Sequence, residues 1–260
     1  MPGSSPPLKV FITGASGGLG AALARHYGSR SGACLGLAGR RAEALDELAQ
    51  SLPCETASYV ADVRDAGALA RAGADFMGRY GCPELVFANA GVSAGTLTEC
   101  PEDLAVFREI VETNLLGVVH TFHPFVEAMR RARQGTLVGI ASLAGFRGLP
   151  GAGAYSASKA GVIAYLESLR LELRNAGVAV VTICPGYIRT PMTAGNPYFM
   201  PFLLDAERAA ARIAAMAAKE RRHGVVPWPM AVVGAALKAL PRPVYDILFE
   251  RAPRKPRRRG

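Results

Sequence analysis

The stretch that decides the fold is LKVFITGASGGLG, residues 8–20. Residues 8–12 are mostly apolar and predict a short buried strand, and residues 17–27 predict a helix. A glycine-rich turn between a strand and a helix lets backbone N–H groups approach a pyrophosphate, which the helix N-terminus also favours. Small residues in such a turn also serve plain packing, so the turn alone leaves both interpretations open. The residues of this turn expected to contact a dinucleotide are Gly14, Ser16, Gly18, Leu19 and Gly20.

The same strand–helix alternation continues outward along the chain. Strands are predicted at 33–38, 58–60, 84–88, 136–141 and 178–184, and helices at 42–52, 65–80, 103–133 (which a bend could divide) and 153–175. Strands that alternate with helices of ten or more residues imply a parallel sheet. With right-handed crossovers, we expect an α/β fold: a doubly wound, Rossmann-like sheet with helices on both faces and a C-terminal helical extension.

Charge is concentrated at the C-terminal end of the chain. The 260 residues carry 30 Lys and Arg against 21 Asp and Glu, a net charge of +9. The last ten residues, RAPRKPRRRG, hold six of these basic groups, which leaves residues 1–250 with 24 basic against 21 acidic groups. A strongly basic chain can indicate nucleic acid or anionic lipid as a partner. Because the excess lies in a proline-interrupted end without aromatic residues, we expect a solvated, disordered tail at 251–260 and no specific nucleic-acid partner.

The end of the second predicted strand indicates which dinucleotide is bound. An NAD site usually has a carboxylate here, whereas this chain has Gly39 followed by Arg40 and Arg41. Guanidinium groups suit a 2′-phosphate, so NADP (NADPH) is expected rather than NAD. The alternative is a pair of solvated arginines at a helix start. Asp62, after the third strand, could accept a hydrogen bond from the adenine amino group or serve as a turn residue.

Three further residues form a candidate reactive set. Ser142 follows the fifth strand, and Tyr155 and Lys159 are one helical turn apart on the next helix. A free tyrosine is a poor base because its pKa is about 10, and a neighbouring ammonium stabilises the phenolate. A serine hydroxyl can hold the same substrate oxygen. The set predicts proton transfer at an alcohol or carbonyl beside a hydride donor.

Together these motifs resemble the short-chain dehydrogenase/reductase family, in its NADP-preferring subgroup. The resemblance covers roughly residues 8 to 224. The matching positions are Thr13–Gly20, Asn89-Ala90-Gly91, Asn114, the triad of Ser142, Tyr155 and Lys159, and Pro185-Gly186 with Thr190. The chain departs from the family at Gly17, the alternative basic position of NADP-binding members. The expectation of NADP therefore depends on Arg40, with Arg41 in support.

The resemblance implies a role for each matched residue. Tyr155 would be the general acid/base, Ser142 would orient the substrate oxygen, and Lys159 would hold the nicotinamide ribose and tune Tyr155. Asn114 would carry a water that relays protons to Lys159. Around the dinucleotide the resemblance and the strand ends place Arg40, Arg41, Asp62, Val63, Asn89, Ala90, Gly91, Pro185, Gly186, Ile188 and Thr190.

The resemblance also identifies residues 187–205 as a substrate lid. This segment is rich in proline, methionine and aromatic residues, which suggests a hydrophobic alcohol or ketone such as a lipid, steroid-like or aromatic carbonyl. Ordinary loop packing is the alternative interpretation. The candidate lining residues are Tyr187, Met192, Tyr198, Phe199 and Phe202.

The C-terminal part departs from the family. Family members commonly end with a seventh strand and an Asp-Gly-Gly turn that packs across a tetramer, and neither is expected here. Residues 227–250 instead predict two short helices separated by prolines. This extension could pack on its own fold or on a dimer mate, could be a core helix, or could lie in a membrane interface with Trp228 inserted. A homodimer through the helix near Asp103 and the Tyr155 helix is favoured over a tetramer.

The remaining expectations concern organisation and rival functions. We expect a disordered N-terminus at 1–7, one catalytic domain at 8–226, the extension at 227–250 and the basic tail. Five scattered cysteines indicate neither a disulfide scaffold nor a metal site. The opening MPGSSPPL has no signal-peptide pattern, so a cytoplasmic protein is expected. The alternatives to ketone reduction are a 3-oxoacyl-thioester reductase, a non-catalytic NADP-binding sensor and a membrane-docking protein.

Overall fold

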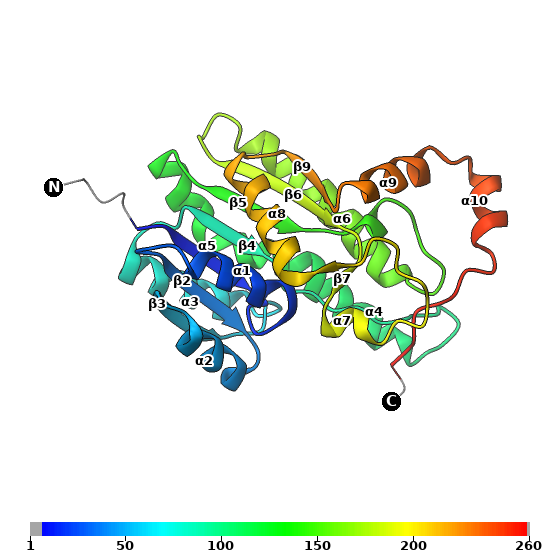
Figure 1. Cartoon of the computed structure of the whole chain (residues 1–260), viewed down its shortest axis with the longest axis horizontal. Coiled ribbons are helices and arrows are strands. Elements are labelled where there is room, and N and C mark those ends of the chain that lie inside the picture. Colours follow the sequence, from blue (N-terminus) through cyan, green and yellow to red (C-terminus); the bar gives the residue numbers. More distant parts are fainter. Residues whose placement is uncertain (1–6, 259–260) are drawn as a thin grey trace.

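Residues 7–258 are described by the computed structural model, and over them the chain forms one seven-stranded parallel sheet (Figure 1). The strand order is β3-β2-β1-β4-β5-β6-β9, so the direction of chain progression reverses between β1 and β4. The strands are β1 (Lys9–Thr13), β2 (Cys34–Gly39), β3 (Glu55–Val60), β4 (Leu85–Ala88), β5 (Thr136–Ile140), β6 (Ala179–Pro185) and β9 (His223–Val226). The predicted doubly wound fold is confirmed, while residues 1–6 of the predicted disordered N-terminus lie outside the described part.

Helices cover both faces of this sheet. On one face α1 (Gly18–Gly28), α2 (Ala42–Ser51) and α8 (Ala206–Ala218) share an apolar core with β1, β2 and β6. On the other face α3 (Ala66–Tyr80), α5 (Gly117–Ala132) and α6 (Gly153–Glu172) form the second core. The smaller elements are α4 (Asp103–Val111), η1 (Glu112–Leu116), η2 (Leu143–Gly145), α7 (Pro191–Ala194) and the two-residue strands β7 (Ile188–Arg189) and β8 (Leu204–Asp205). In the described part of the chain, no helix is long and apolar enough to cross a membrane.

The long helix predicted at 103–133 is divided by a π-helical turn. α4 ends at Val111, η1 occupies Glu112–Leu116, and α5 continues from Gly117. A π-helical turn adds one residue to the helical repeat and shifts the side chains beyond it. Asn114 lies in this turn and is completely buried. The bend thus places a polar side chain inside the protein, next to the site described below.

The seventh strand, which was not expected, is present. β9 pairs with β6 in parallel register, from Thr182 opposite His223 to Pro185 opposite Val226. Val226 is completely buried, and its carbonyl accepts a 2.8 Å hydrogen bond from Gly186 N. Pro227 has no N–H group to continue the ladder, so the strand ends there. The prediction was wrong because four residues are too few to recognise as a strand without the edge that they cover.

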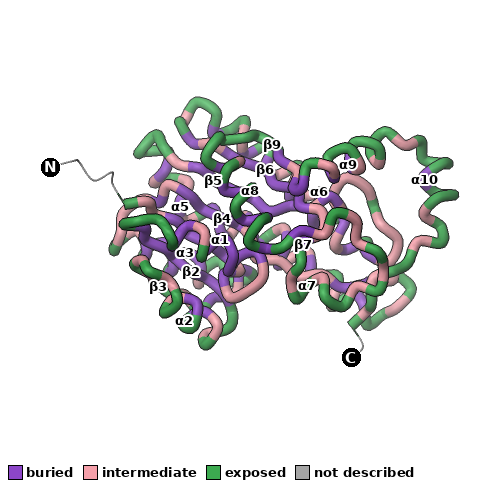
Figure 2. The backbone as a smooth tube through the Cα atoms, in the orientation of Figure 1, coloured by how far each residue is buried: buried purple, intermediate pink, exposed green. Residues whose placement is uncertain are grey.

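After β9 the chain forms the two predicted helices, α9 (Pro229–Ala239) and α10 (Arg242–Phe249) (Figure 1). α9 contacts the loop after β5, since a Cβ at Gly234 would lie 2.7 Å from Leu143 and Phe146. α10 is held through Tyr245, whose hydroxyl donates to the Gly148 carbonyl. The outward faces of both helices are exposed and apolar, with Trp228, Val232, Val244, Ile247 and Leu248 at the surface (Figure 2).

The basic tail differs from the prediction of a solvated, disordered segment. Its residues through 258 fold back over the protein, and Gly95 N donates a 2.8 Å hydrogen bond to the Pro256 carbonyl. Arg257 forms ion pairs with Asp103 and Glu102. Asp103 is only 2% exposed, so its carboxylate needs a partner, and the tail supplies one. The prediction failed because the acidic partners lie about 150 positions earlier in the sequence; residues 259–260 lie outside the described part.

Phe11 is the centre of an aromatic cluster that joins β1 to the helices below it. Its ring centroid lies 4.8 Å from that of Phe125, 5.5 Å from Phe76 and 5.7 Å from Tyr59. Phe11→Ala should lower the free energy of unfolding by about 3–5 kcal/mol, because the cavity left behind cannot collapse. Urea denaturation measures this, with Phe199→Ala at a surface ring as the control. Equal midpoints for the two variants would show that the cluster does not hold the sheet.

Candidate active site

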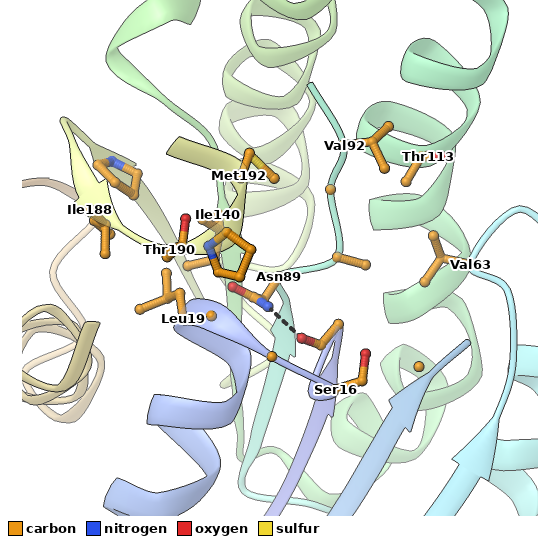
Figure 3. A pocket seen from close by; sticks show the side chains of 18 of the residues that line it. Ser16, Leu19, Val63, Asn89, Val92, Thr113, Ile140, Ile188, Thr190 and Met192 are labelled. Atoms are coloured by element: carbon orange, nitrogen blue, oxygen red, sulfur yellow. Dashed lines mark hydrogen bonds between the residues drawn. The ribbon is translucent and has the colours of Figure 1, made fainter. Parts of the chain in front are cut away.

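The turn after β1 packs directly against the end of β4. A Cβ at Gly14 would lie 2.7 Å from Ala90 Cα, and one at Gly20 would lie 2.1 Å from the Gly14 carbonyl oxygen. Gly14 and Gly18 also have φ angles of +70° and +54°, which glycine adopts without strain. Asn89 Nδ2 fixes the turn by donating to the carbonyls of Thr13 (3.1 Å) and Gly14 (3.3 Å); Figure 3 shows one hydrogen bond from Asn89 to the turn. Only glycines allow this approach, so the turn has a packing role. Gly14, Ser16, Gly17, Gly18 and Leu19 also line the cavity described next, so the turn is accessible to a ligand there.

A cavity of about 450 Å³ extends along the carboxyl ends of the strands. This is the position expected for ligands in such a sheet, where the strand order reverses. Figure 3 shows Ser16 and Leu19 of the turn, Asn89 and Thr190 around a common space. The predicted residues that line it are Gly14, Ser16, Gly18, Leu19, Arg40, Arg41, Asp62, Val63, Asn89, Ala90, Gly91, Ser142, Tyr155, Lys159, Pro185, Gly186, Ile188, Thr190 and Met192. Gly20 and Asn114 lie behind this lining.

One end of the cavity is basic. Arg40 and Arg41 are exposed at the end of β2, and Arg41 donates to the Ser16 carbonyl. A Cβ at Gly17 would lie 2.9 Å from Arg41 Nη2, so the guanidinium covers the glycine. Gly17 is the family's alternative basic position. The guanidinium of Arg41, which follows the neighbouring strand β2, therefore lies where a basic side chain at position 17 would begin.

Asp62 lies at the same end and forms the turn that was one of its two predicted roles. Its carboxylate accepts from Arg64 N at 2.9 Å and from the Arg64 guanidinium at 2.7 Å. This turn, together with Arg40, holds the pKa of Asp62 below its usual range. The residue also lines the cavity, but its acceptor capacity is largely taken by Arg64.

The reactive set comes together at the other end. Ser142 follows β5, and its Oγ accepts a 3.1 Å hydrogen bond from Ala144 N. Tyr155 and Lys159 lie one turn apart on α6, with Lys159 Nζ 6.0 Å from the Tyr155 ring centroid. Burial raises the pKa of the Tyr155 phenol, while the neighbouring Ser142 hydroxyl lowers it. Burial lowers the pKa of Lys159 to about 8. The phenol is thus protonated at neutral pH and has a titratable ammonium beside it.

Asn114 connects the loop after β4 to α6. Its amide donates to the Val92 carbonyl at 2.9 Å and to Ser158 Oγ at 3.1 Å, and its Oδ1 accepts from Val92 N at 2.8 Å. Lys159 Nζ in turn donates to the Ile140 carbonyl at 2.7 Å. These bonds orient α6 relative to β4 and β5. The water role that the resemblance implies for Asn114 stays a prediction, since its side chain is occupied by protein groups.

Most of the predicted substrate residues do not line the cavity. Met192 lines it from α7, whereas Phe199 and Phe202 are 87% and 54% exposed and lie outside it. Tyr187 and Tyr198 are near each other, with ring centroids 6.3 Å apart, and also lie outside the lining. Composition predicts an apolar lid but not which rings turn inward, because the lid backbone decides their direction.

Sequence reasoning also missed part of the lining. The missed residues are small or apolar and have no chemical signature: Gly17, Gly39, Ala61, Val92, Thr113, Ile140, Ala141, Pro191 and Thr193. Each lies close to a recognised motif or at a strand end. Their proximity to the motifs was the one signal that could have identified them.

Comparison with known proteins agrees with this geometry. The profile of the family described as short chain dehydrogenase matches residues 9–198. An uncharacterized oxidoreductase of Myxococcus xanthus is 37% identical over 245 residues, which is 93% of this chain and 96% of that protein. Dehydrogenase/reductase SDR family member 7B of Bos taurus is 33% identical over 270 residues, covering 96% of this chain and 82% of that one.

Solved structures show the same fold. Levodione reductase superposes with a TM-score of 0.73 at 26% identity, covering 85% of this chain and 95% of its own. A short-chain dehydrogenase from Streptomyces avermitilis superposes with a TM-score of 0.77 at 25% identity, covering 88% and 92%. With a family match over most of its length and relatives above 30% identity, the chain belongs to the short-chain dehydrogenase/reductase family, whose oxidoreductases use a nicotinamide cofactor.

Proposed function

We propose that the protein is an NADP(H)-dependent oxidoreductase that interconverts a secondary alcohol and a ketone with a largely apolar body. The observation that carries this proposal is the single cavity that joins Arg40 and Arg41 at one end to Ser142, Tyr155 and Lys159 at the other. A cation-lined end suits a phosphate, and the opposite end holds an acid/base pair. This arrangement combines cofactor recognition and proton transfer in one continuous site.

The residues along the cavity fit a dinucleotide. The Gly14–Gly20 turn allows close approach of a pyrophosphate to the start of α1, and the two guanidinium groups suit a 2′-phosphate. Lys159 would bind the nicotinamide ribose, with Ile188 and Thr190 toward the carboxamide. When bound, the cofactor supplies or accepts the hydride.

Proton transfer falls to the Tyr155 phenol. In reduction Tyr155 donates its proton to the ketone oxygen, and Ser142 donates a hydrogen bond to the same oxygen. In oxidation the phenolate takes the hydroxyl proton, and the Lys159 ammonium stabilises that phenolate. The raised pKa of Tyr155 favours its role as an acid near neutral pH. The oxidation direction should accordingly gain from alkaline pH.

The walls beyond Tyr155 favour an apolar substrate body. Val92, Pro191 and Met192 are apolar members of the cavity lining. Apolar side chains recognise a substrate by area rather than by hydrogen bonds. This supports a hydrophobic alcohol or ketone more than a sugar.

A 3-oxoacyl-thioester reductase is the second candidate, because of one group of relatives. A putative ketoacyl reductase of Streptomyces coelicolor is 34% identical over 191 residues, covering 71% of this chain and 72% of that one. A non-catalytic NADP-binding sensor is disfavoured, since the serine, the tyrosine and the lysine are all in the cavity wall.

The homodimer and the membrane contact stay predictions. Leu104, Phe107, Leu116 and Leu171 leave apolar side chains exposed on α4, η1 and α6, the elements expected at a dimer interface. The exposed faces of α9 and α10 favour contact with an apolar surface. The cytoplasmic location likewise stays a prediction.

Replacement of Tyr155 tests the acid/base assignment. Tyr155→Phe removes only the hydroxyl, so turnover should fall about 100-fold or more while the cofactor still binds. Ketone-dependent NADPH consumption and NADPH fluorescence measure the two quantities. A variant that retains turnover would exclude Tyr155 as the proton donor.

Replacement of Arg40 tests cofactor selectivity. Arg40→Ala should weaken NADPH binding about tenfold or more, because a charge-assisted contact is lost, and should leave NADH binding nearly unchanged. Arg25→Ala, on the far part of α1, is the control. An unchanged ratio of NADPH to NADH affinity would contradict the role of Arg40.

A substrate panel separates the two candidate reactions. We expect NADPH consumption with aromatic or long-chain ketones and little with sugars or small polar ketones. A requirement for acyl-carrier or coenzyme A thioesters would favour the second candidate. Activity confined to sugars would contradict the apolar-substrate proposal.

A further inference from the structure

The last described residues, 252–258, form a strap that runs past Tyr155. From α10 the chain turns back and runs toward α4 (Figure 1). Its backbone joins the loop after β4, since Gly95 N donates to the Pro256 carbonyl at 2.8 Å. A Cβ at Gly95 would lie 2.2 Å from the Lys255 carbonyl oxygen. The strap therefore has a specific seat that requires glycine at position 95.

Arginine side chains anchor the strap at its far end. Arg257 Nε lies 2.7 Å from an oxygen of Asp103, and Arg257 Nη2 lies 2.6 Å from Glu102. Asp103 also accepts from Leu97 N at 2.7 Å, so the anchor is tied to the same loop. Arg258 pairs with Glu109, nearly two helical turns further along α4. Together these contacts engage the neighbouring carboxylates of Glu102, Asp103 and Glu109.

Lys255 belongs to this seat through its backbone, and its side chain lies beside Tyr155. Its ammonium nitrogen is 5.8 Å from the centroid of the Tyr155 ring. The side chain is half-buried, and its ammonium forms no hydrogen bond or ion pair within residues 7–258. Burial lowers the pKa of Lys255, and no carboxylate offsets this.

The segments beside Lys255 are those that frame Tyr155. Thr96 N donates to the Gly151 carbonyl at 3.0 Å, which joins the loop after β4 to the residues just before α6. A Cβ at Gly151 would lie 2.9 Å from Arg254, so the strap rests on this junction. Val92 and Ala94 pack with Tyr155 in one apolar cluster. The strap thus adds a wall next to the phenol, with a cation in it.

A half-buried ammonium without a partner is costly, and an incoming anion would remove that cost. The protein's nearby carboxylates are already bound to Arg257 and Arg258. The cation also lies beside the residue that handles the substrate oxygen. The group that would pair with the Lys255 ammonium is therefore an anionic group on the substrate itself.

We propose that residues 252–258 complete the substrate site and that Lys255 is a substrate-binding residue for a carboxylate on the ketone. This inference rests on the proposed oxidoreductase function and narrows its substrate to an amphiphilic keto acid: an apolar body against Val92 and Met192, and an anionic end at Lys255. Arg257 is a positioning residue that holds the strap to α4.

The test compares a keto acid with its methyl ester, using 4-oxo-4-phenylbutanoate as the acid. The wild-type enzyme should prefer the acid in kcat/KM, and Lys255→Ala should reduce the acid-to-ester ratio about tenfold. Lys255→Arg should restore most of the ratio, because it restores the charge. Arg251→Ala, which removes an exposed charge just before the strap, should leave the ratio at the wild-type value. An acid-to-ester ratio equal in wild type and Lys255→Ala overturns the inference.

Replacement of Arg257 and a binding measurement distinguish a failure of this inference from a failure of the proposed oxidoreductase function. Arg257→Ala should raise KM for the acid more than it changes kcat, and Arg257→Lys should partly rescue it. Calorimetry with NADP-loaded Tyr155→Phe protein measures acid binding without turnover. Acid binding that depends on Lys255, without any ketone reduction, would retain the inference and reject the proposed function. Reduction of acid and ester at a ratio insensitive to Lys255 would do the reverse.

Discussion

The close packing of the Gly14–Gly20 turn against Asn89 and Ala90 is the constraint on which the rest of the site depends. It occurs between β1 and β4, where the strand order reverses and the sheet leaves a crevice. Because a side chain at Gly14 or Gly20 would collide with backbone, the turn can neither widen nor carry a larger residue. Asn89 fixes the turn with two hydrogen bonds, so the protein's own contacts set the shape of the turn.

A second set of polar contacts extends this order to α6. Asn114 holds the loop after β4 to Ser158, and Lys159 reaches the Ile140 carbonyl at the end of β5. Buried polar groups of this kind find all their hydrogen-bond partners in only one arrangement of the helix and the strands. Their hydrogen bonds therefore favour that arrangement over others as well as stabilising it. The π-helical turn at Glu112–Leu116 places Asn114 where it can make these bonds. The relative positions of Tyr155 and Ser142 follow from this framework.

The positive charge of the chain is distributed over defined sites rather than over one surface. Arg40 and Arg41 line one end of the cavity, and Arg257 and Arg258 bind carboxylates on or next to α4. Lys255 remains beside Tyr155. A tail that would be solvated by itself becomes ordered because Asp103 is buried and needs a cation. The surroundings of Tyr155 consequently include a residue of the C-terminal tail as well as the motifs of the first 190 positions.

By itself the sequence determined the features that depend on neighbours along the chain: the strand–turn–helix of residues 8–28, the helical spacing of Tyr155 and Lys159, and the Asp65 cap that accepts from Ala68 N. These follow from backbone sterics, periodicity and local hydrogen bonds. Only the tertiary structure decided the strand at His223–Val226, the outward direction of Phe199 and Phe202, the placement of Arg41 over Gly17, and the course of the tail. Each of these depends on a partner far away in sequence. The partner of a sheet edge, of a buried carboxylate or of an uncovered glycine is fixed only when the chain folds. The free energy of such a contact comes from burial and charge pairing between distant segments, and the local sequence does not contain that information.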